Sequence, residues 1–194
     1  MRTGSEDLPI DDIAALLELA TGNRHALRTL YDRYSARVYN TAVSYLQSAE
    51  EAEEATQDVF LELAASASRF EQRSSVSTWI YRLTVNQCLD RLRYRNRKKR
   101  RAKLLSIFGD KGELLHDVAT FEHPGIAMEK QEDARHLFAA IDELPERQKT
   151  AFVLTYVEEL SGKEVAEVMG LTVKGVESLI QRAKANLRKI LEKE

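Results

Sequence analysis

The sequence predicts an all-α protein with two small helical domains, an N-terminal four-helix bundle and a C-terminal helix-turn-helix domain, joined by a flexible linker. Apolar residues recur at spacings of three and four along most of the chain, as one face of a helix requires. The 194 residues include only 8 Gly and 3 Pro, too few for a turn-rich β-sandwich or barrel. The helical pattern breaks once, over a long stretch. We therefore expect a first domain at residues 1–95, a basic stretch and linker at 96–133, and a second domain at 134–194.

The first two helices are expected before residue 48. Asp11 or Asp12 can cap the first helix, because a short carboxylate accepts hydrogen bonds from the free N–H groups of the first turn, and Gly22 ends it. The second helix has apolar residues at spacings of three and four: Leu27, Leu30, Tyr31, Tyr34, Val38, Ala42 and Leu46.

Two further helices complete the bundle. Ser48, with Glu51 three residues later, is a capping-box pattern that opens the third helix. A polar segment at 69–77 separates it from a fourth helix, which carries Tyr81, Val85, Cys88, Leu89 and Leu92 before it reaches a basic run. Four helices bounded in this way predict one bundle at about residues 8–95.

The second domain contains the pattern of a helix-turn-helix. Between 102 and 133 the apolar periodicity loosens, and it returns at Ala134. Ser161 can cap a short helix, Gly170 can adopt the left-handed turn that ends it, and Thr172 can cap a longer helix. The longer helix presents Val176, Ile180, Ala183 and Leu187 on one face, which predicts that this face is buried.

The opposite face of that longer helix is polar and basic. Side chains of this kind suit phosphates and base edges in a major groove, so we expect duplex DNA binding by Lys163, Lys174, Ser178, Gln181, Arg182, Ala185 and Arg188. The alternative is a plain helical hairpin with a solvated polar face.

Charge is distributed unevenly along the chain, although the net charge is only −2. Nine basic residues and no acid lie between Arg91 and Lys103, whereas six acids and no base lie between Glu50 and Glu62. Polyanions respond to such local charge. We expect phosphate-backbone contacts by Arg93, Arg97, Lys98, Lys99, Arg100 and Arg101, the alternative being a solvated helix face.

Aromatic residues and arginines alternate just before the basic run. Phe70, Trp79 and Tyr81 lie close in sequence to Arg73 and Arg82. Unstacked bases can lie on such rings while guanidinium groups hold phosphates, which predicts a platform for single-stranded nucleic acid. The alternative is that Trp79 and Tyr81 are core residues; Tyr81 shares a helix face with Val85.

Composition limits the cellular compartments in which this protein is expected. Hydrophobic residues make up 43% and charged residues 31%, no apolar run approaches the ~18 residues that cross a bilayer, and the first nine residues lack the apolar stretch of a secretion signal. Cys88 is the only cysteine, so no intrachain disulfide can form. We expect a cytoplasmic protein without direct membrane insertion.

Two long stretches resemble conserved regions of bacterial extracytoplasmic-function (ECF) sigma factors. The second conserved region of that family is similar to EEAEEATQDVFLELAASASRF followed by STWIYRLTVNQCLDRLRYRNRKKRR. The fourth region is similar to IDELPERQKTAFVLTYVEELSGKEVAEVMGLTVKGVESLIQRAKANLRKIL. The stretches occur in the family's order with a linker between them and no third region.

The resemblance implies a dissociable subunit of RNA polymerase that recognises the −35 and −10 promoter elements and melts the −10 region. Its implied partners are the β and β′ subunits of the core enzyme, promoter DNA and an anti-sigma factor, with no cofactor, metal or small-molecule substrate and no enzymatic activity. The helix from Val173 would read the −35 element. Contacts with the β′ clamp helices are implied for Glu53, Gln57, Asp58 and Leu61.

The resemblance also assigns the aromatic segment to −10 melting, with one base of the non-template strand flipped into a pocket. The residues implied are Phe70, Arg73, Ser74, Ser75, Thr78, Trp79, Arg82 and Asn86. Two departures put sequence preference in doubt: many relatives have basic residues in place of Glu177 and Leu179, and the melting loop lacks the glycine often found after its phenylalanine.

Three other interpretations stay open from the residues alone. A helix-turn-helix regulator that binds duplex DNA without polymerase would explain the second domain only. A metal-dependent nuclease could use the acids at 50–54, but no His or Cys lies near them. Residues 104–108 could be an apolar anchor for an anti-sigma factor or part of the second domain's core.

Overall fold

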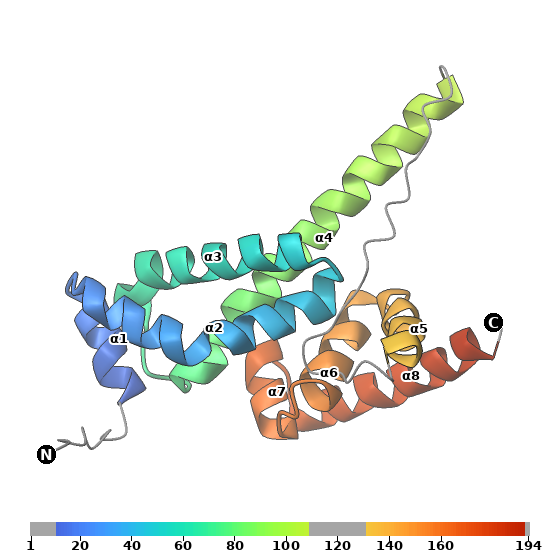
Figure 1. Ribbon diagram of the computed structural model, residues 1–194. Helices are drawn as coiled ribbons and strands as arrows, with labels where there is room; N and C mark the ends of the chain where they lie inside the picture. Colours follow the sequence, from blue (N-terminus) through green and yellow to red (C-terminus); the bar gives the residue numbers. More distant parts are fainter. Residues whose placement is uncertain (1–10, 109–130, 193–194) are drawn as a thin grey trace, which may run out of the picture.

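The computed structural model describes residues 11–108 and 131–192, with side chains described for 11–102 and 134–192. Every regular element in these ranges is helical (Figure 1). The elements are α1 (Asp12–Ala20), α2 (Arg24–Leu46), α3 (Ala49–Ser66), the 3-10 turn η1 (Ala67–Arg69), α4 (Val76–Phe108), α5 (Gln131–Asp142), α6 (Glu146–Tyr156), α7 (Gly162–Met169) and α8 (Val173–Leu191).

The predicted N-terminal bundle is confirmed. Asp11 caps α1 by accepting a hydrogen bond from the Ile13 N–H at 3.0 Å, and Ser48 caps α3 by accepting from the Glu51 N–H at 3.3 Å. One apolar cluster of α1, α2, α3, η1 and α4 contains Leu16, Leu30, Leu63 and Ile80, all buried. This cluster uses no residue after Leu83, so the bundle has a core of its own.

The fourth helix extends beyond residue 95, the expected end of the first domain. Residues 96–108 continue α4, which projects away from the body of the molecule (Figure 1, green). Arg, Lys, Leu and Ala favour helix, and the first glycine after residue 95 is Gly109. The basic run is therefore an extended helical arm. Residues 109–130 lie outside the described part, as do the side chains of 104–108, which were considered as an anchor.

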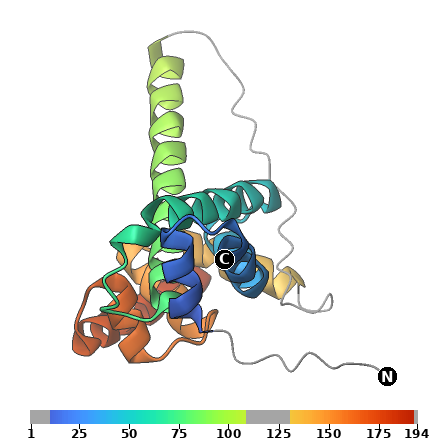
Figure 2. The same cartoon turned by 90° about the vertical axis from the view of Figure 1, so that its left-hand side faces the viewer.

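The two helical domains lie side by side and share part of their cores (Figure 2). Helix α7 contacts α4, and α6 contacts α2. The shared cluster joins Leu46 and Val85 of the first domain to Ile141 and Leu154 of the second. The sequence predicted both domains but not this contact between them, because apolar periodicity shows that a face is buried and not what buries it.

The helices of the described residues were compared with what a membrane-spanning helix requires. None of their helices combines the length and the hydropathy that a bilayer crossing needs.

Candidate nucleic-acid interfaces

The helix-turn-helix is built by three local signals that the sequence predicted. Ser161 and Glu164 form a full capping box at the start of α7. Gly170 ends α7 with φ 62° and ψ 39°, a left-handed conformation that glycine adopts without a steric cost. Thr172 caps α8 by accepting from the Gly175 N–H at 3.1 Å. These caps fix the angle between the two helices.

Helix α8 turns its apolar residues inward and its basic residues outward. Val176, Ala183 and Leu187 are buried against α5, α6 and α7. The residues expected to bind duplex DNA are all exposed: Lys163, Lys174, Ser178, Gln181, Arg182, Ala185 and Arg188. The geometry leaves the outer face of α8 open to a groove.

A pocket lies beside the start of α4, where the aromatic segment was predicted to act. It has a volume of about 270 Å³ and is lined by Arg69, Phe70, Glu71, Arg73, Ser74, Trp79 and Arg82. The rings of Phe70 and Trp79 lie 5.2 Å apart, centroid to centroid, at an interplanar angle of 35°. Both rings also pack against the bundle core. The pocket thus joins aromatic faces to three guanidinium groups, the combination that suits a nucleobase and its phosphate.

Not every residue expected in melting faces this pocket. The Ser75 hydroxyl caps α4 by accepting from the Thr78 N–H at 3.0 Å, and Thr78 is only 4% exposed. Thr78 therefore shapes the start of the helix and is not open to a base. Asn86 is exposed, one turn beyond Arg82. Tyr81 is buried, in agreement with the alternative prediction that it is a core residue.

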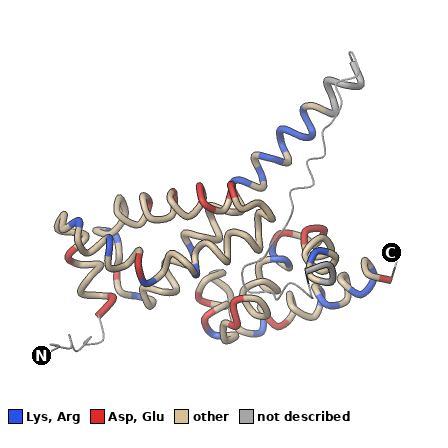
Figure 3. The backbone as a smooth tube through the Cα atoms, in the orientation of Figure 1, with Lys and Arg blue, Asp and Glu red and all other residues tan. Residues whose placement is uncertain are grey.

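The basic run divides into paired and unpaired residues. Arg91 binds the carboxylates of Glu54 (2.9 Å) and Asp58 (2.5 Å) on α3. Arg93 binds Glu146 of the second domain and Asp90, and Arg95 donates to the Leu46 carbonyl at 3.3 Å. Beyond them, the cations of the arm whose side chains are described are all exposed: Arg97, Lys98, Lys99, Arg100 and Arg101. Figure 3 shows this stretch of basic residues along the projecting part of α4.

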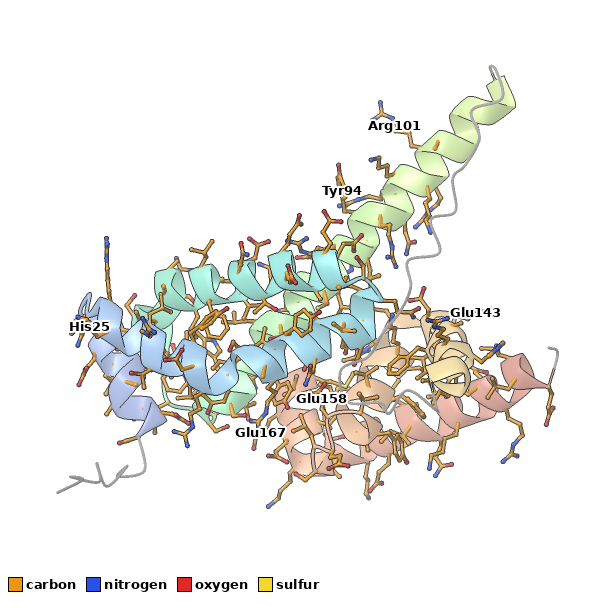
Figure 4. All side chains as sticks on the ribbon, in the orientation of Figure 1. His25, Tyr94, Arg101, Glu143, Glu158 and Glu167 are labelled. Atoms are coloured by element: carbon orange, nitrogen blue, oxygen red, sulfur yellow. The ribbon has the colours of Figure 1, made fainter. Side chains whose placement is uncertain are left out.

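We expect the arm to control the salt dependence of DNA binding. Replacing Lys98, Lys99, Arg100 and Arg101 together by glutamine should reduce the slope of log affinity against log salt by about 0.9 for each phosphate that the arm no longer neutralises. The measurement is a binding titration of the holoenzyme on promoter DNA at several salt concentrations. Arg24→Gln/Arg28→Gln is the control, because it removes exposed cations near His25, at the end of the molecule opposite Arg101 (Figure 4). An unchanged slope in the arm variant would show that these cations do not touch DNA.

Helix α3 presents a different surface. Glu53, Gln57 and Leu61 are exposed at intervals of four residues, and Leu61 is 67% exposed, an unusual position for a leucine. Asp58, expected to belong to the same surface, is partly exposed and pairs with Arg91.

The sequence did not predict that α2 completes this surface. The spacing placed Tyr31 on the buried face of its helix, but its ring is 44% exposed and packs on Phe60 at 4.8 Å. Between α2 and α3 lies a groove of about 460 Å³, lined by Tyr31, Ser35, Ala36, Tyr39, Glu53, Thr56 and Gln57. In the sequence, an exposed aromatic residue at helical spacing cannot be distinguished from a core residue. Only the packing of the helices shows that Tyr31 is exposed.

Two of the four acids considered for a nuclease are engaged in ion pairs. Glu54 pairs with Arg91, and Glu51 lies 3.9 Å from Arg95. Within the described residues, no group of three or more His, Cys, Asp or Glu is placed to hold a metal ion.

Comparison with known proteins assigns both domains to one class. Residues 30–98 match the family described as Sigma-70 region 2, and residues 135–187 match Sigma-70, region 4. These two regions together define a sigma factor of the sigma-70 type.

Individual relatives narrow this class. The chain is 30% identical over 178 residues to the ECF RNA polymerase sigma-E factor of Haemophilus influenzae, covering 90% of this chain and 92% of that protein. It is 29% identical over 178 residues to the ECF RNA polymerase sigma factor SigW of Bacillus subtilis, covering 90% and 93%. The chain belongs to the ECF group of the sigma-70 family.

A solved structure shows the same fold. In the complex titled "Structure of CnrH in complex with the cytosolic domain of CnrY", a chain that is 22% identical aligns with a TM-score of 0.65, over 94% of this chain and 98% of that one. As a sigma factor, the protein binds RNA polymerase core and promoter DNA, and it directs promoter recognition and transcription initiation. Sigma factors act as initiation factors and not as enzymes.

Proposed function

We propose that the two domains divide promoter opening between them. Helix α8 enters the major groove of the −35 element, and the pocket at Phe70 and Trp79 receives a base flipped from the non-template strand of the −10 element. The exposed arm of α4 holds the upstream backbone. The observation that carries this proposal is the pocket. A protein that binds only intact duplex DNA does not need aromatic faces and guanidinium groups around a pocket of this kind.

Energetics explain why the free subunit binds promoters weakly. Extruding a base costs a few kcal/mol of stacking and pairing, a sum that one small pocket does not recover. Polymerase supplies the missing contacts. The acting species is thus the holoenzyme, in the cytoplasm, and the chain itself needs no cofactor, metal or small-molecule substrate and has no enzymatic activity of its own.

The surface of α2 and α3 fits the polymerase side of this assembly. Exposed apolar side chains surrounded by acidic and amide groups are typical of a protein interface with a basic partner. We infer that Leu61, Gln57 and Glu53 contact the clamp helices of β′, with Tyr31 beside them.

An alteration of Leu61 tests this surface. Leu61→Arg should weaken binding to core polymerase by about tenfold or more, as removal of an interface anchor does. Leu17→Arg on α1, where the leucine is 46% exposed, is the matched control and should bind normally. Gel filtration with core enzyme gives the measurement. Equal binding by both variants would remove α3 from the polymerase interface.

An anti-sigma factor is the remaining proposed partner. CnrH was solved with the cytosolic domain of CnrY, and a second chain of similar fold, RpoE of Bartonella quintana, was solved with the anti-sigma factor NepR. The second aligns with a TM-score of 0.59 over 85% of this chain. We infer that this chain too is held inactive by such a protein.

One experiment tests the proposed function as a whole. In vitro transcription with core polymerase over a library of genomic fragments should yield transcripts that depend on this protein, and alignment of their starts should reveal two conserved elements. Transcription that is equal without the protein would contradict the proposal.

A further inference from the structure

Helix α8 carries basic side chains along its outer face, with one exception. From residue 173 to residue 189 the charged residues are five cations and a single acid, Glu177. Glu177 is exposed, whereas Val176, Ala183 and Leu187 are buried on the side of α8 that contacts α5, α6 and α7. Figure 1 shows that the opposite side of α8 is not covered by any described helix. The Glu177 carboxylate therefore lies among the side chains expected to bind duplex DNA.

The stability of α8 does not explain this acid. Acidic side chains stabilise a helix from its first turn, near the positive end of the dipole, but the first turn of α8 contains none. An acid can also stabilise a helix by pairing with a cation three or four residues away. No described side chain forms an ion pair or a hydrogen bond with the Glu177 carboxylate, although Lys174 precedes it by three residues. Glu177 is thus free to bind a group outside the chain.

The chemistry of duplex DNA limits what a carboxylate can bind there. Phosphates repel it, and the donors in the major groove are the N4 amino group of cytosine and the N6 amino group of adenine. Adenine also presents the N7 acceptor beside its amino group, which suits an amide that both donates and accepts. An ionised carboxylate only accepts, so its match is the cytosine amino group.

The position of Glu177 in α8 suits contact with base edges. Recognition helices contact bases through their N-terminal residues, and Glu177 is the fifth residue of α8. Lys174 and Gln181, three residues before and four after, share its side of the helix. One helical turn rises about 5.4 Å and one base pair about 3.4 Å, so these side chains address neighbouring base pairs. Glu177 is therefore placed to read one base pair between those of Lys174 and Gln181.

A carboxylate that enters the groove without a donor weakens binding. It loses hydration without gaining a hydrogen bond, and the surrounding phosphates repel it. A cytosine amino group offsets this cost, whereas the other bases leave it in place. Discrimination therefore comes both from the bond that cytosine makes and from the penalty that other bases leave.

We propose that Glu177 determines base preference in the −35 element by accepting a hydrogen bond from the N4 amino group of one cytosine. This inference rests on the proposed entry of α8 into the −35 major groove. It adds a specificity-determining residue to those expected to bind duplex DNA, none of which is acidic. Replacing that cytosine should weaken wild-type binding by about tenfold, because a hydrogen bond to a charged group is lost.

Selection of promoter DNA with a randomised −35 element by the holoenzyme tests this role. The wild type should enrich cytosine at one position. Glu177→Gln should favour adenine there, because a glutamine amide pairs with both N6 and N7 of adenine. The enrichment of cytosine over adenine at that position should fall by about tenfold or more. Glutamate and glutamine have similar helix propensities, so circular dichroism melting of the variant should match that of the wild type.

Glu143→Gln is the matched control. It removes the same charge from the same domain, but Glu143 is exposed on the side of α5 that points away from α8 (Figure 4), so base enrichment should not change.

Several outcomes would overturn the role of Glu177. Tighter binding of Glu177→Gln to all −35 sequences by one common factor would mean that the carboxylate acts only by repelling phosphates. A wild type that enriches no cytosine, or a variant with an unchanged enrichment profile, would also exclude the role. In each of these cases the wild-type holoenzyme still protects the −35 element. Absence of that protection would instead contradict the entry of α8 into the groove, and the role of Glu177 with it, so the two failures can be distinguished.

Discussion

Replacing Trp79 by alanine is expected to abolish most promoter opening while leaving polymerase binding intact. The indole lines the pocket and lies 5.2 Å from Phe70, so its removal deletes the larger of two stacking surfaces for a flipped base. Stacking of one base on an aromatic ring contributes about 1–3 kcal/mol. The open complex should therefore form about 5- to 150-fold less readily, as measured by permanganate reactivity of unpaired thymines.

Two controls separate a role in stacking from a role in the core. Trp79 also packs against the bundle core, so its loss destabilises the fold to some extent. Trp79→Phe keeps an aromatic face and should restore most of the opening. Gel filtration with core polymerase should show normal binding by both variants. If Trp79→Ala lost polymerase binding and opening to the same degree, the indole would be a core residue only.

Gly170→Val is expected to eliminate binding to the −35 element. Gly170 has φ 62°, and a Cβ there would meet no atom within 4 Å, so the effect comes from backbone strain and not from a clash. A side chain in the left-handed region costs roughly 1–2 kcal/mol, and a β-branched valine suffers more. The correct turn should become at least about five- to thirtyfold less populated. Footprinting of the holoenzyme on promoter DNA measures the loss.

Asparagine supplies the control for this position. It tolerates the left-handed conformation better than valine, so Gly170→Asn should retain most of the footprint. The N-terminal bundle should stay folded in both variants, because one of its two apolar clusters contains no residue of the second domain. A normal footprint from Gly170→Val would mean that the turn does not control how α8 is presented.

The Trp79 and Gly170 predictions concern two parts of the molecule that are in contact through Arg82 and Glu167. Gly170 follows the last turn of α7, and the Glu167 carbonyl in that turn receives the Arg82 guanidinium. Strain at Gly170 therefore also disturbs a contact between the two domains.

Much of the candidate site could be predicted from the sequence, because it depends on local chemistry. The caps at Ser161 and Thr172 and the turn at Gly170 are set by residues within one helical turn. The outward face of α8 follows from the spacing of Val176, Ala183 and Leu187. The closeness of Phe70 and Trp79 could be expected for a similar reason, since they are nine positions apart in the sequence.

The sequence could not show contacts that form only in the folded chain. Asp58, assigned to the polymerase surface, also pairs with Arg91 of α4, and Thr78, assigned to −10 DNA, is buried at the start of α4. The first domain was expected to end near residue 95, before a basic stretch and linker at 96–133, but α4 continues to residue 108 because Arg, Lys, Leu and Ala favour helix. Tyr31 was placed in the core, although its helix is not covered at that point.

The amino-acid sequence by itself determined the helical elements, their caps, the two domains and the family, since each depends on periodicity and local hydrogen bonding. Tertiary structure alone decided which charges are free. Arg82 and Arg93 are chemically like Arg97, but the first two meet a carbonyl and a carboxylate from a domain more than 50 residues away, while Arg97 extends into solvent on the arm. Ion pairs between distant segments follow from packing, which no local pattern encodes, and packing therefore determines which arginines are available to DNA.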